Sequence, residues 1–250
     1  MNPARRHDPG LSRSRSAATR RPFLHDRPPT RSSLPRYTTA AMRTTPLRLM
    51  IFDRSCTGPR LRPGLSHAWW SGAQLYGRVL GRLDAWHGAH SWAEALTWVA
   101  QHQPSRPIAE LQFWGHGKWG RAYIERDILD ATALHPGHPL HASLLAIRER
   151  LVGPEALWWF RTCETFGALP GHDFARRFSD FLGARAAGHT YIIGGWQSGL
   201  HSLGPGEQPG WSPLEGLKAG PPEDPREALW SRRREPNTIH FLSGKIPAGY

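Results

Sequence analysis

The sequence predicts an α/β protein with a doubly wound, mostly parallel sheet flanked by helices. Short, bulky apolar runs alternate along the chain with longer segments whose apolar residues recur at helical spacing. The run 156–160, bounded by Gly153-Pro154 and Gly167, is typical of a strand buried on both faces. Strands of this kind occur in parallel sheets, whose right-handed crossover helices cover both faces.

The expected elements alternate between strand and helix from residue 47 onward. Strands are expected at residues 47–52, 83–86, 108–114, 156–160 and 187–194, with an edge strand at 237–243. Helices are expected at residues 67–83, 91–103, 139–151 and 172–182, and a strand or one arm of a hairpin at 122–128.

Two local signals support the helix assignments. In the first helix one apolar stripe is expected, formed by Leu75, Tyr76, Val79, Leu80 and Leu83. The pattern Ser-x-x-Glu is a capping box, in which the Ser and Glu side chains bond the free N–H groups of the first turn. It opens the second helix at Ser91 and predicts a further short helix at Ser212–Glu215.

Residues 1–46 are rich in Arg, Ser, Thr and Pro without hydrophobic periodicity, so they are expected to be disordered. Residues 47–250 form a single predicted domain, with a Pro-rich loop at 218–236. Residues 19–24 imitate a twin-arginine export signal, but no apolar stretch follows them.

The charge of the chain is concentrated in its first part. Of the net +12, residues 1–41 supply +7 through nine Arg against two Asp, which leaves +5 for the rest. Only three of the 32 basic residues are Lys and the rest are Arg. Such an excess of Arg is typical of the base composition of a genome rather than of selection for phosphate contacts. We therefore expect no specific nucleic-acid partner, although the basic tail could bind polyanions nonspecifically.

Other classes are disfavoured by composition. Two cysteines, Cys56 and Cys163, provide neither a disulfide framework nor a zinc cluster, which suits a cytoplasmic location. No apolar run is long enough to span a membrane. His135, His138 and His141 lie among prolines without a nearby carboxylate, so a structural loop is expected there and no metal or cofactor. The sequence predicts no particular oligomeric state.

Two residues with reactive side chains stand where predicted strands end. His116 follows the strand 108–114, and Cys163 follows the strand 156–160. The carboxyl ends of parallel strands gather the ligand chemistry of α/β sheets. If the two strands are neighbours, a thiol lies beside an imidazole that takes its proton or, once charged, lowers its pKa. Alone, such a Cys is usually a small buried hydrophobe and such a His a hydrogen-bonded structural residue.

The motifs Trp114-Gly115-His116-Gly117 and Trp159-Phe160-Arg161-Thr162-Cys163 resemble those of the clan CD, or caspase-like, cysteine peptidases. His116 and Cys163 are 47 residues apart, against roughly 50 in caspases. The resemblance covers about residues 47–203 and is nearest to the uncharacterised bacterial branch. Arg161-Thr162 and Glu164-Thr165 flank Cys163 where caspases carry Gln-Ala and a basic residue with Gly.

The resemblance implies a caspase-like fold and an endopeptidase acting on a peptide or protein. Cys163 would attack the scissile carbonyl, His116 would move the proton, and the backbone N–H groups of Gly117 and Cys163 would stabilise the oxyanion. The candidate substrate-binding residues are Arg54, Arg161, Trp196 and Gln197. Alternatively, Arg54 is a solvated arginine in a loop, and Trp196 only covers the end of the sheet. For the whole chain, the alternative is an inactive module that binds a peptide or protein partner.

Overall fold

The computed structural model describes residues 45–58 and 64–250. The predicted disordered tail and the twin-arginine-like stretch lie outside the described residues, except for Thr45 and Pro46. All the helices and strands given below belong to the compact unit formed by residues 43–250.

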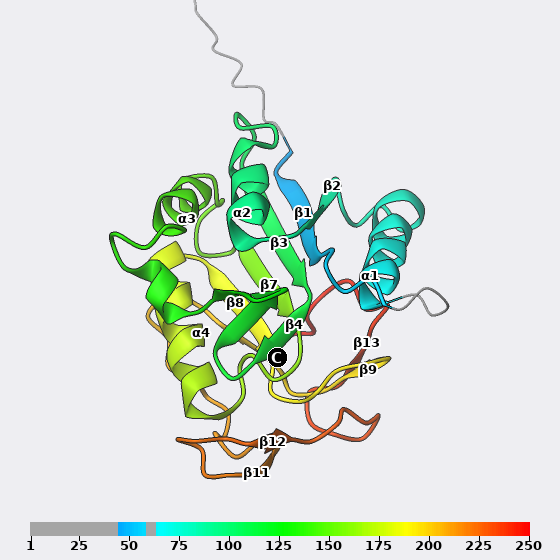
Figure 1. The fold of residues 1–250 in the computed structure, drawn as a ribbon, viewed down its shortest axis with the longest axis vertical. Helices are drawn as coiled ribbons and strands as arrows, with labels where there is room; N and C mark the ends of the chain where they lie inside the picture. The colour runs from blue at the N-terminus through cyan, green and yellow to red at the C-terminus, as the bar shows by residue number, and fades with distance from the viewer. Residues whose placement is uncertain (1–44, 59–63) are drawn as a thin grey trace, which may run out of the picture. The chain divides into compact units, whose positions relative to one another are not determined.

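A six-stranded sheet forms the centre of this unit, with the strand order β10-β8-β7-β3-β1-β2 (Figure 1). Five strands are parallel and β10 is antiparallel to β8. The predicted α/β class with a mostly parallel sheet is confirmed. The chain first adds β2 outside β1 and then returns to the other side of β1, which makes the sheet doubly wound. The strands are β1 (Leu47–Asp53), β2 (Ala85–Ala89), β3 (Ile108–Trp114), β7 (Leu157–Arg161), β8 (Arg185–His189) and β10 (Leu200–Leu203).

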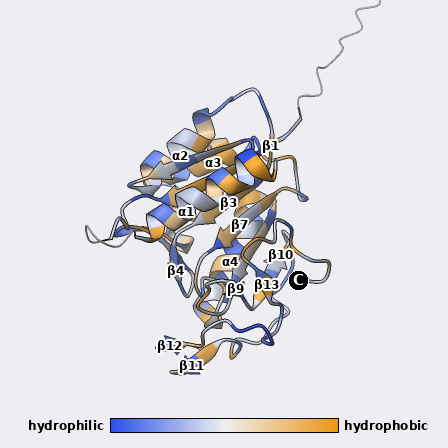
Figure 2. Cartoon of the chain, turned by 90° about the vertical axis from the view of Figure 1, so that its right-hand side faces the viewer, coloured by the Kyte–Doolittle hydropathy of each residue, from blue (hydrophilic) through white to orange (hydrophobic). Residues whose placement is uncertain are grey.

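Helices cover the two faces unequally. One face packs against α2 (Trp92–Gln101), α3 (His141–Arg148) and α4 (Ala168–Leu182). The β1 and β3 part of the other face packs against α1 (Leu65–Gln74) and the π-helical turn η1 (Leu75–Val79), on the opposite side of the sheet in Figure 1. Figure 2 shows the apolar strands enclosed between these layers.

The alternation of side chains along β7 explains why this strand is apolar throughout. Trp158 and Phe160 face the helices α2 to α4, whereas Trp159 faces the opposite layer. All three side chains have no exposed surface, so the predicted burial of this strand on both faces is confirmed.

The C-terminal segment takes the place of a helix over β7, β8 and β10. Ile239 joins a cluster with Trp159, Ala187 and Leu200, and Ile246 and Tyr250 pack against it. The segment begins with β13 (Ile239–His240), which pairs with β9 (Trp196–Gln197) rather than with the central sheet. The expected edge strand at 237–243 is therefore shorter and belongs to a separate ribbon.

Small antiparallel ribbons extend from the ends of the central strands. One contains β4 (His116–Lys118), β5 (Arg121–Ile124) and β6 (Asp127–Leu129). The stretch 122–128, expected to be a single strand or one hairpin arm, turns after Ile124 and is divided between β5 and β6. The 3-10 turn η2 (Ala131–Leu134) follows this ribbon. The Pro-rich stretch 218–236 contains part of a second ribbon, formed by β11 (Leu217–Ala219) and β12 (Glu227–Ala228).

The predicted first helix is wrong in its second half. The backbone N–H of Leu80 donates to the carbonyl of Leu75 at 2.9 Å, so this turn spans one residue more between donor and acceptor than an α-helical turn does. This change of period turns Val79 and Leu80 outward, so that they are 72% and 40% exposed instead of completing the apolar stripe.

Two other predictions fail because distant residues compete for local groups. The strand expected at 187–194 ends at His189, since the next residues turn away and Ile192 bonds the backbone of Leu229. No helix forms at Ser212–Glu215, because the Glu215 carboxylate accepts hydrogen bonds from Thr190 and His201.

Candidate functional site

His116 and Cys163 lie at the same edge of the central sheet. Strands β3 and β7 are parallel neighbours, and Trp114 pairs with Arg161 at the end of their ladder. Two residues further along each strand are His116 and Cys163, so the register of the sheet delivers both to one place. The two residues line a common cavity of about 480 Å³.

Gly117 holds the His116 segment directly against the turn that carries Cys163. A Cβ at position 117 would lie 2.7 Å from the carbonyl oxygen of Cys163, so only glycine fits there. The next residues fasten the contact, because the N–H groups of Trp119 and Gly120 donate to the carbonyls of Glu164 and Thr165 at 2.9 and 2.8 Å. The N–H of Cys163 donates to no backbone carbonyl within the described ranges.

The imidazole of His116 is exposed, and its nearest aromatic neighbour is Trp69 of α1. The two rings meet edge to face, with centroids 5.4 Å apart. No hydrogen bond joins the His116 ring to the Cys163 thiol in the described part of the chain. The place of Trp69 beside His116 could not be predicted from the sequence, because it depends on how α1 crosses the sheet. The only sequence signal for it is the pair Trp69-Trp70 on an otherwise amphipathic helix.

The thiol of Cys163 is difficult to ionise in this structure. Burial raises the pKa of Cys163 to about 11, and the charge of Glu164 adds to this effect. Hydrogen bonds from the backbone N–H groups of Ile193 and Cys163 offset it in part. The expectation that an imidazolium would lower the pKa of this thiol is therefore wrong for the free protein.

Glu164, which follows Cys163, is itself an unusual carboxylate. Its φ of +20° is rare for a residue with a side chain, and one carboxylate oxygen is buried without a hydrogen-bond partner among the described residues. Burial raises the pKa of Glu164 to about 7, although the charge of Lys118 opposes the rise. It lines a second cavity of about 470 Å³ together with Lys118, Lys218, Arg226 and Arg232.

Arg161 and Gln197 line the cavity of Cys163 and are bonded to each other. The Arg161 guanidinium lies over the rings of Trp114 and Trp159, each 4.6 Å from the ring centroid. Its donors reach the Gln197 Oε1 atom, the Tyr76 hydroxyl and the carbonyls of Phe241 and Ser243. These contacts use all five N–H groups that an arginine has. Burial lowers the pKa of Arg161.

The other two candidate substrate-binding residues do not join this site. Arg54 lines a separate cavity of about 560 Å³ with Trp70 and Trp86. Trp196 is 39% exposed and meets His240 edge to face, outside the residues that line the cavity of Cys163.

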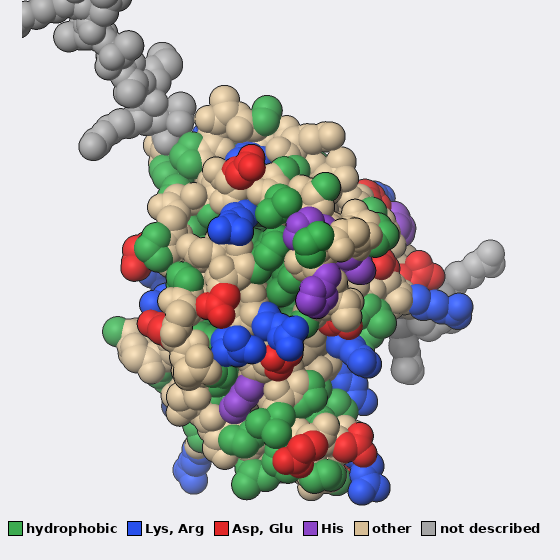
Figure 3. Space-filling view, turned by 90° about the vertical axis from the view of Figure 1, so that its left-hand side faces the viewer, with side chains coloured by type: hydrophobic (Ala, Val, Ile, Leu, Met, Phe, Trp, Pro, Cys, Tyr) green, Lys and Arg blue, Asp and Glu red, His purple; other side chains and the backbone are tan. Residues whose placement is uncertain are grey.

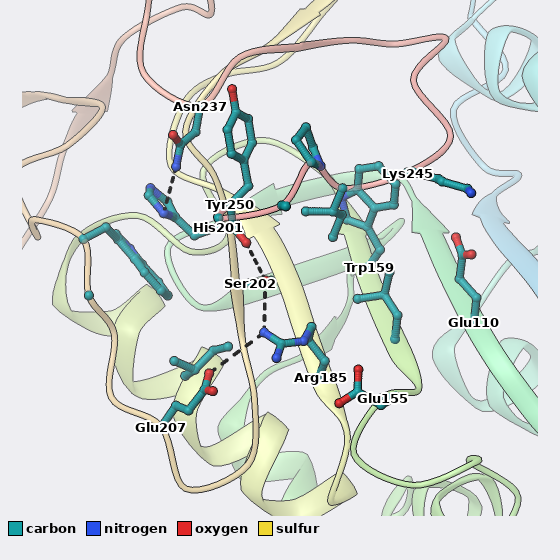
Figure 4. Close-up of a pocket in the computed structure, with 18 of the residues that line it drawn as sticks. Glu110, Glu155, Trp159, Arg185, His201, Ser202, Glu207, Asn237, Lys245 and Tyr250 are labelled. Carbon is teal, nitrogen blue, oxygen red and sulfur yellow. Dashed lines mark hydrogen bonds and ion pairs between the residues drawn. The ribbon is translucent and has the colours of Figure 1, made fainter.

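A cavity of about 1240 Å³, larger than the one beside Cys163, lies between the β8–β10 edge and the C-terminal segment (Figure 4). There Arg185 donates to the Ser202 hydroxyl, which donates to the carbonyl of Tyr250 at 2.6 Å. His201 is bound to Glu215 at 2.7 Å, and no hydrogen bond within the described ranges connects it to the Ser202 hydroxyl. The hydrogen bonds around this cavity hold the C-terminal segment to the sheet. The described residues that line the cavity include no activated nucleophile.

No three His, Cys, Asp or Glu side chains of the described residues converge in a way that would hold a metal ion. On the face drawn in Figure 3, Lys and Arg side chains are interspersed with Asp and Glu rather than gathered into one patch. Among the helices of residues 45–58 and 64–250, none combines the length and apolar composition that crossing a bilayer requires. Neither a family model nor a curated protein sequence matches this chain.

Proposed function

We propose that the protein is a caspase-like cysteine endopeptidase with a His116–Cys163 dyad. The observation that carries the proposal is that both residues leave adjacent parallel strands at the same edge and line one cavity. This is the arrangement that the sequence resemblance requires, and a peptide carbonyl placed in the cavity would have the thiol and the imidazole on hand.

The high pKa of the thiol decides how such a dyad would work. At pH 7 a thiol with a pKa of about 11 is almost wholly protonated, so a resting thiolate–imidazolium pair does not form. His116 instead acts as a general base while the sulfur attacks the scissile carbonyl carbon. The proton passes from sulfur to the imidazole and then to the leaving amine, and water later hydrolyses the acyl-enzyme.

The oxyanion formed in this attack needs donors close to the sulfur. The N–H of Cys163 is free of backbone partners in the described ranges, and Gly117 lies against the same turn. Two such donors would stabilise the tetrahedral intermediate, each by about 3 kcal/mol. The exposed His116 ring has to approach the thiol when the peptide binds, because no hydrogen bond joins them in the described structure.

A second candidate is a peptide-binding module on the same frame, without chemistry. Two observations favour this alternative: the pKa of Cys163 is raised, and no hydrogen bond joins its thiol to the His116 imidazole within the described residues. The two candidates share the cavity and differ only in whether the peptide is cut.

A peptide library of mixed sequence, incubated with the protein and read by mass spectrometry, separates the two. For a peptidase we expect cleavage that Cys163→Ala abolishes and His116→Ala lowers by at least about 100-fold. Cys56→Ala and His138→Ala are matched controls that do not line the cavity and should cleave normally. Absence of cleavage by the unaltered chain, or cleavage that survives Cys163→Ala, would exclude the peptidase.

A further inference from the structure

We propose that the cavity beside Cys163 accepts a large apolar side chain of an extended peptide and selects against acidic and basic side chains. The proposal rests on the proposed function in that the ligand is a peptide. It adds the specificity, which depends on the chemistry of the cavity wall.

The wall of the cavity is largely apolar. Helix α1 and the start of η1 contribute one side, the end of β3 another, and the loop after β8 with Phe241 the third. The apolar side chains are Leu65, Ala68, Trp69, Leu75, Trp114, Ile193 and Phe241. Gly72 lets α1 come close enough for this, because a Cβ there would lie 2.6 Å from the Trp114 ring. A volume of about 480 Å³ is within the usual range of ligand pockets.

A basic side chain would find no counter-ion in this cavity. No Asp or Glu is among the described residues that line it, and the titratable side chains present are His116, Arg161 and Cys163. A Lys or Arg of the peptide would lose its hydration without an ionic partner, which is costly in an apolar surrounding.

An acidic side chain would meet Arg161, whose donors are already occupied. All five N–H groups bond oxygens of the protein, at distances from 2.6 to 3.3 Å. A carboxylate could bond this arginine only by displacing Gln197, the Tyr76 hydroxyl or a backbone carbonyl of the C-terminal segment. Each displaced buried oxygen would lose its partner, at about 1–3 kcal/mol.

One segment of the chain already makes an extended-strand pairing next to the cavity. β13 runs antiparallel to β9, and the next residue, Phe241, donates its N–H to the carbonyl of Gly195 at 3.0 Å. This pairing brings an aromatic side chain to the cavity wall. Phe241 is 37% exposed and does not fill the cavity. An extended peptide can therefore place a large apolar side chain of its own in the cavity, next to Phe241.

The test measures binding and cleavage separately. Fluorescent peptides that differ at one residue, which is Phe, Leu, Ala, Asp or Arg, are titrated onto the Cys163→Ala protein by fluorescence polarisation. We expect the Phe and Leu peptides to bind at least tenfold more tightly than the Asp, Arg and Ala peptides. In the unaltered protein, cleavage should follow the same order.

A charge placed in the wall should change the order. Ala68 is exposed and lines the cavity, so Ala68→Glu should raise affinity for the Arg peptide by about tenfold and weaken the Phe peptide. Val79→Glu is the matched control, because Val79 lies on the adjoining η1 turn, is exposed and does not line the cavity. It should leave the order unchanged.

The outcomes distinguish this inference from the proposed function. Tightest binding of the Asp or Arg peptide, equal binding of all five, or no binding of any would overturn the specificity, whether or not peptides are cut. Preference for Phe and Leu without any cleavage would sustain the specificity and exclude the peptidase.

Discussion

The reactivity of Cys163 is the property that the structure predicts most directly. In a Cys56→Ser background, Cys163 is the one remaining cysteine of the chain and can be followed alone. Burial and the charge of Glu164 raise its pKa from the usual 9.0 to about 11. We therefore expect its reaction rate with a small disulfide such as 4,4′-dithiodipyridine to rise with pH beyond pH 9.5 without levelling off.

The size of the effect follows from two opposing terms. A pKa two pH units higher reduces the thiolate fraction about 100-fold at any pH below about 8. The more basic thiolate is a better nucleophile by about six- to tenfold, for a Brønsted coefficient of roughly 0.4–0.5. The net rate at pH 7 should be about tenfold below that of the same cysteine in the denatured chain.

Glu164→Gln adds a signature that simple inaccessibility cannot imitate. Glu164 has a pKa of about 7, so it is charged above pH 7 and neutral well below it. The substitution should accelerate Cys163 at pH 8–9 and change nothing at pH 5.5. Glu149→Gln, at an exposed position on the end of α3, is the control and should have no effect at either pH. A plateau below pH 8 in the unaltered protein would refute the reasoning, because the thiol would then be activated at rest.

Three further predictions concern stability. Trp158→Ala should lower the free energy of unfolding by about 3–5 kcal/mol in a urea titration, since its side chain is fully buried; a loss below 1 kcal/mol would contradict the buried strand. Gly117→Ala should lower the free energy of unfolding by about 1–3 kcal/mol, because its Cβ would press on the Cys163 carbonyl. Gly194→Ala meets open space and should leave the free energy of unfolding unchanged. An equal fall in melting temperature for the two variants would refute the close contact at Gly117. Burial lowers the pKa of His189 from 6.5 to about 3, so the contribution of His189 to the free energy of unfolding is fully present above pH 6.5 and is lost as the pH drops toward 3, by at most about 1.4 kcal/mol per pH unit. His189→Gln should flatten this fall, and an unchanged slope would count against a buried neutral His189.

Local sequence patterns were sufficient to predict the central strands that carry the candidate site. The apolar runs of β3 and β7 end abruptly at polar residues, and this contrast depends only on neighbours in the chain. The positions of His116 and Cys163 at strand ends follow from the same local signal. Their place on one edge needed a further assumption, that β3 and β7 are adjacent, which the sheet order supplies.

The roles of Arg161 and of the C-terminal segment could not be predicted in this way. Arg161 reads in the sequence as a charge available to a ligand, yet its partners lie 36 to 85 residues away. Likewise, the pairing of β13 with β9 joins two short segments of weak strand character. Such features depend on the packing of the whole unit, and a change of helical period such as η1 leaves little mark in residue composition.

The partners of Arg161 also determine when the site can be completed during folding. Its hydrogen bonds to the carbonyls of Phe241 and Ser243 close loops of 80 and 82 residues. Contacts of such long range form slowly, because the entropy of loop closure has to be overcome before they contribute. We therefore expect the cavity beside Cys163 to be completed late in folding, after β3 and β7 have paired.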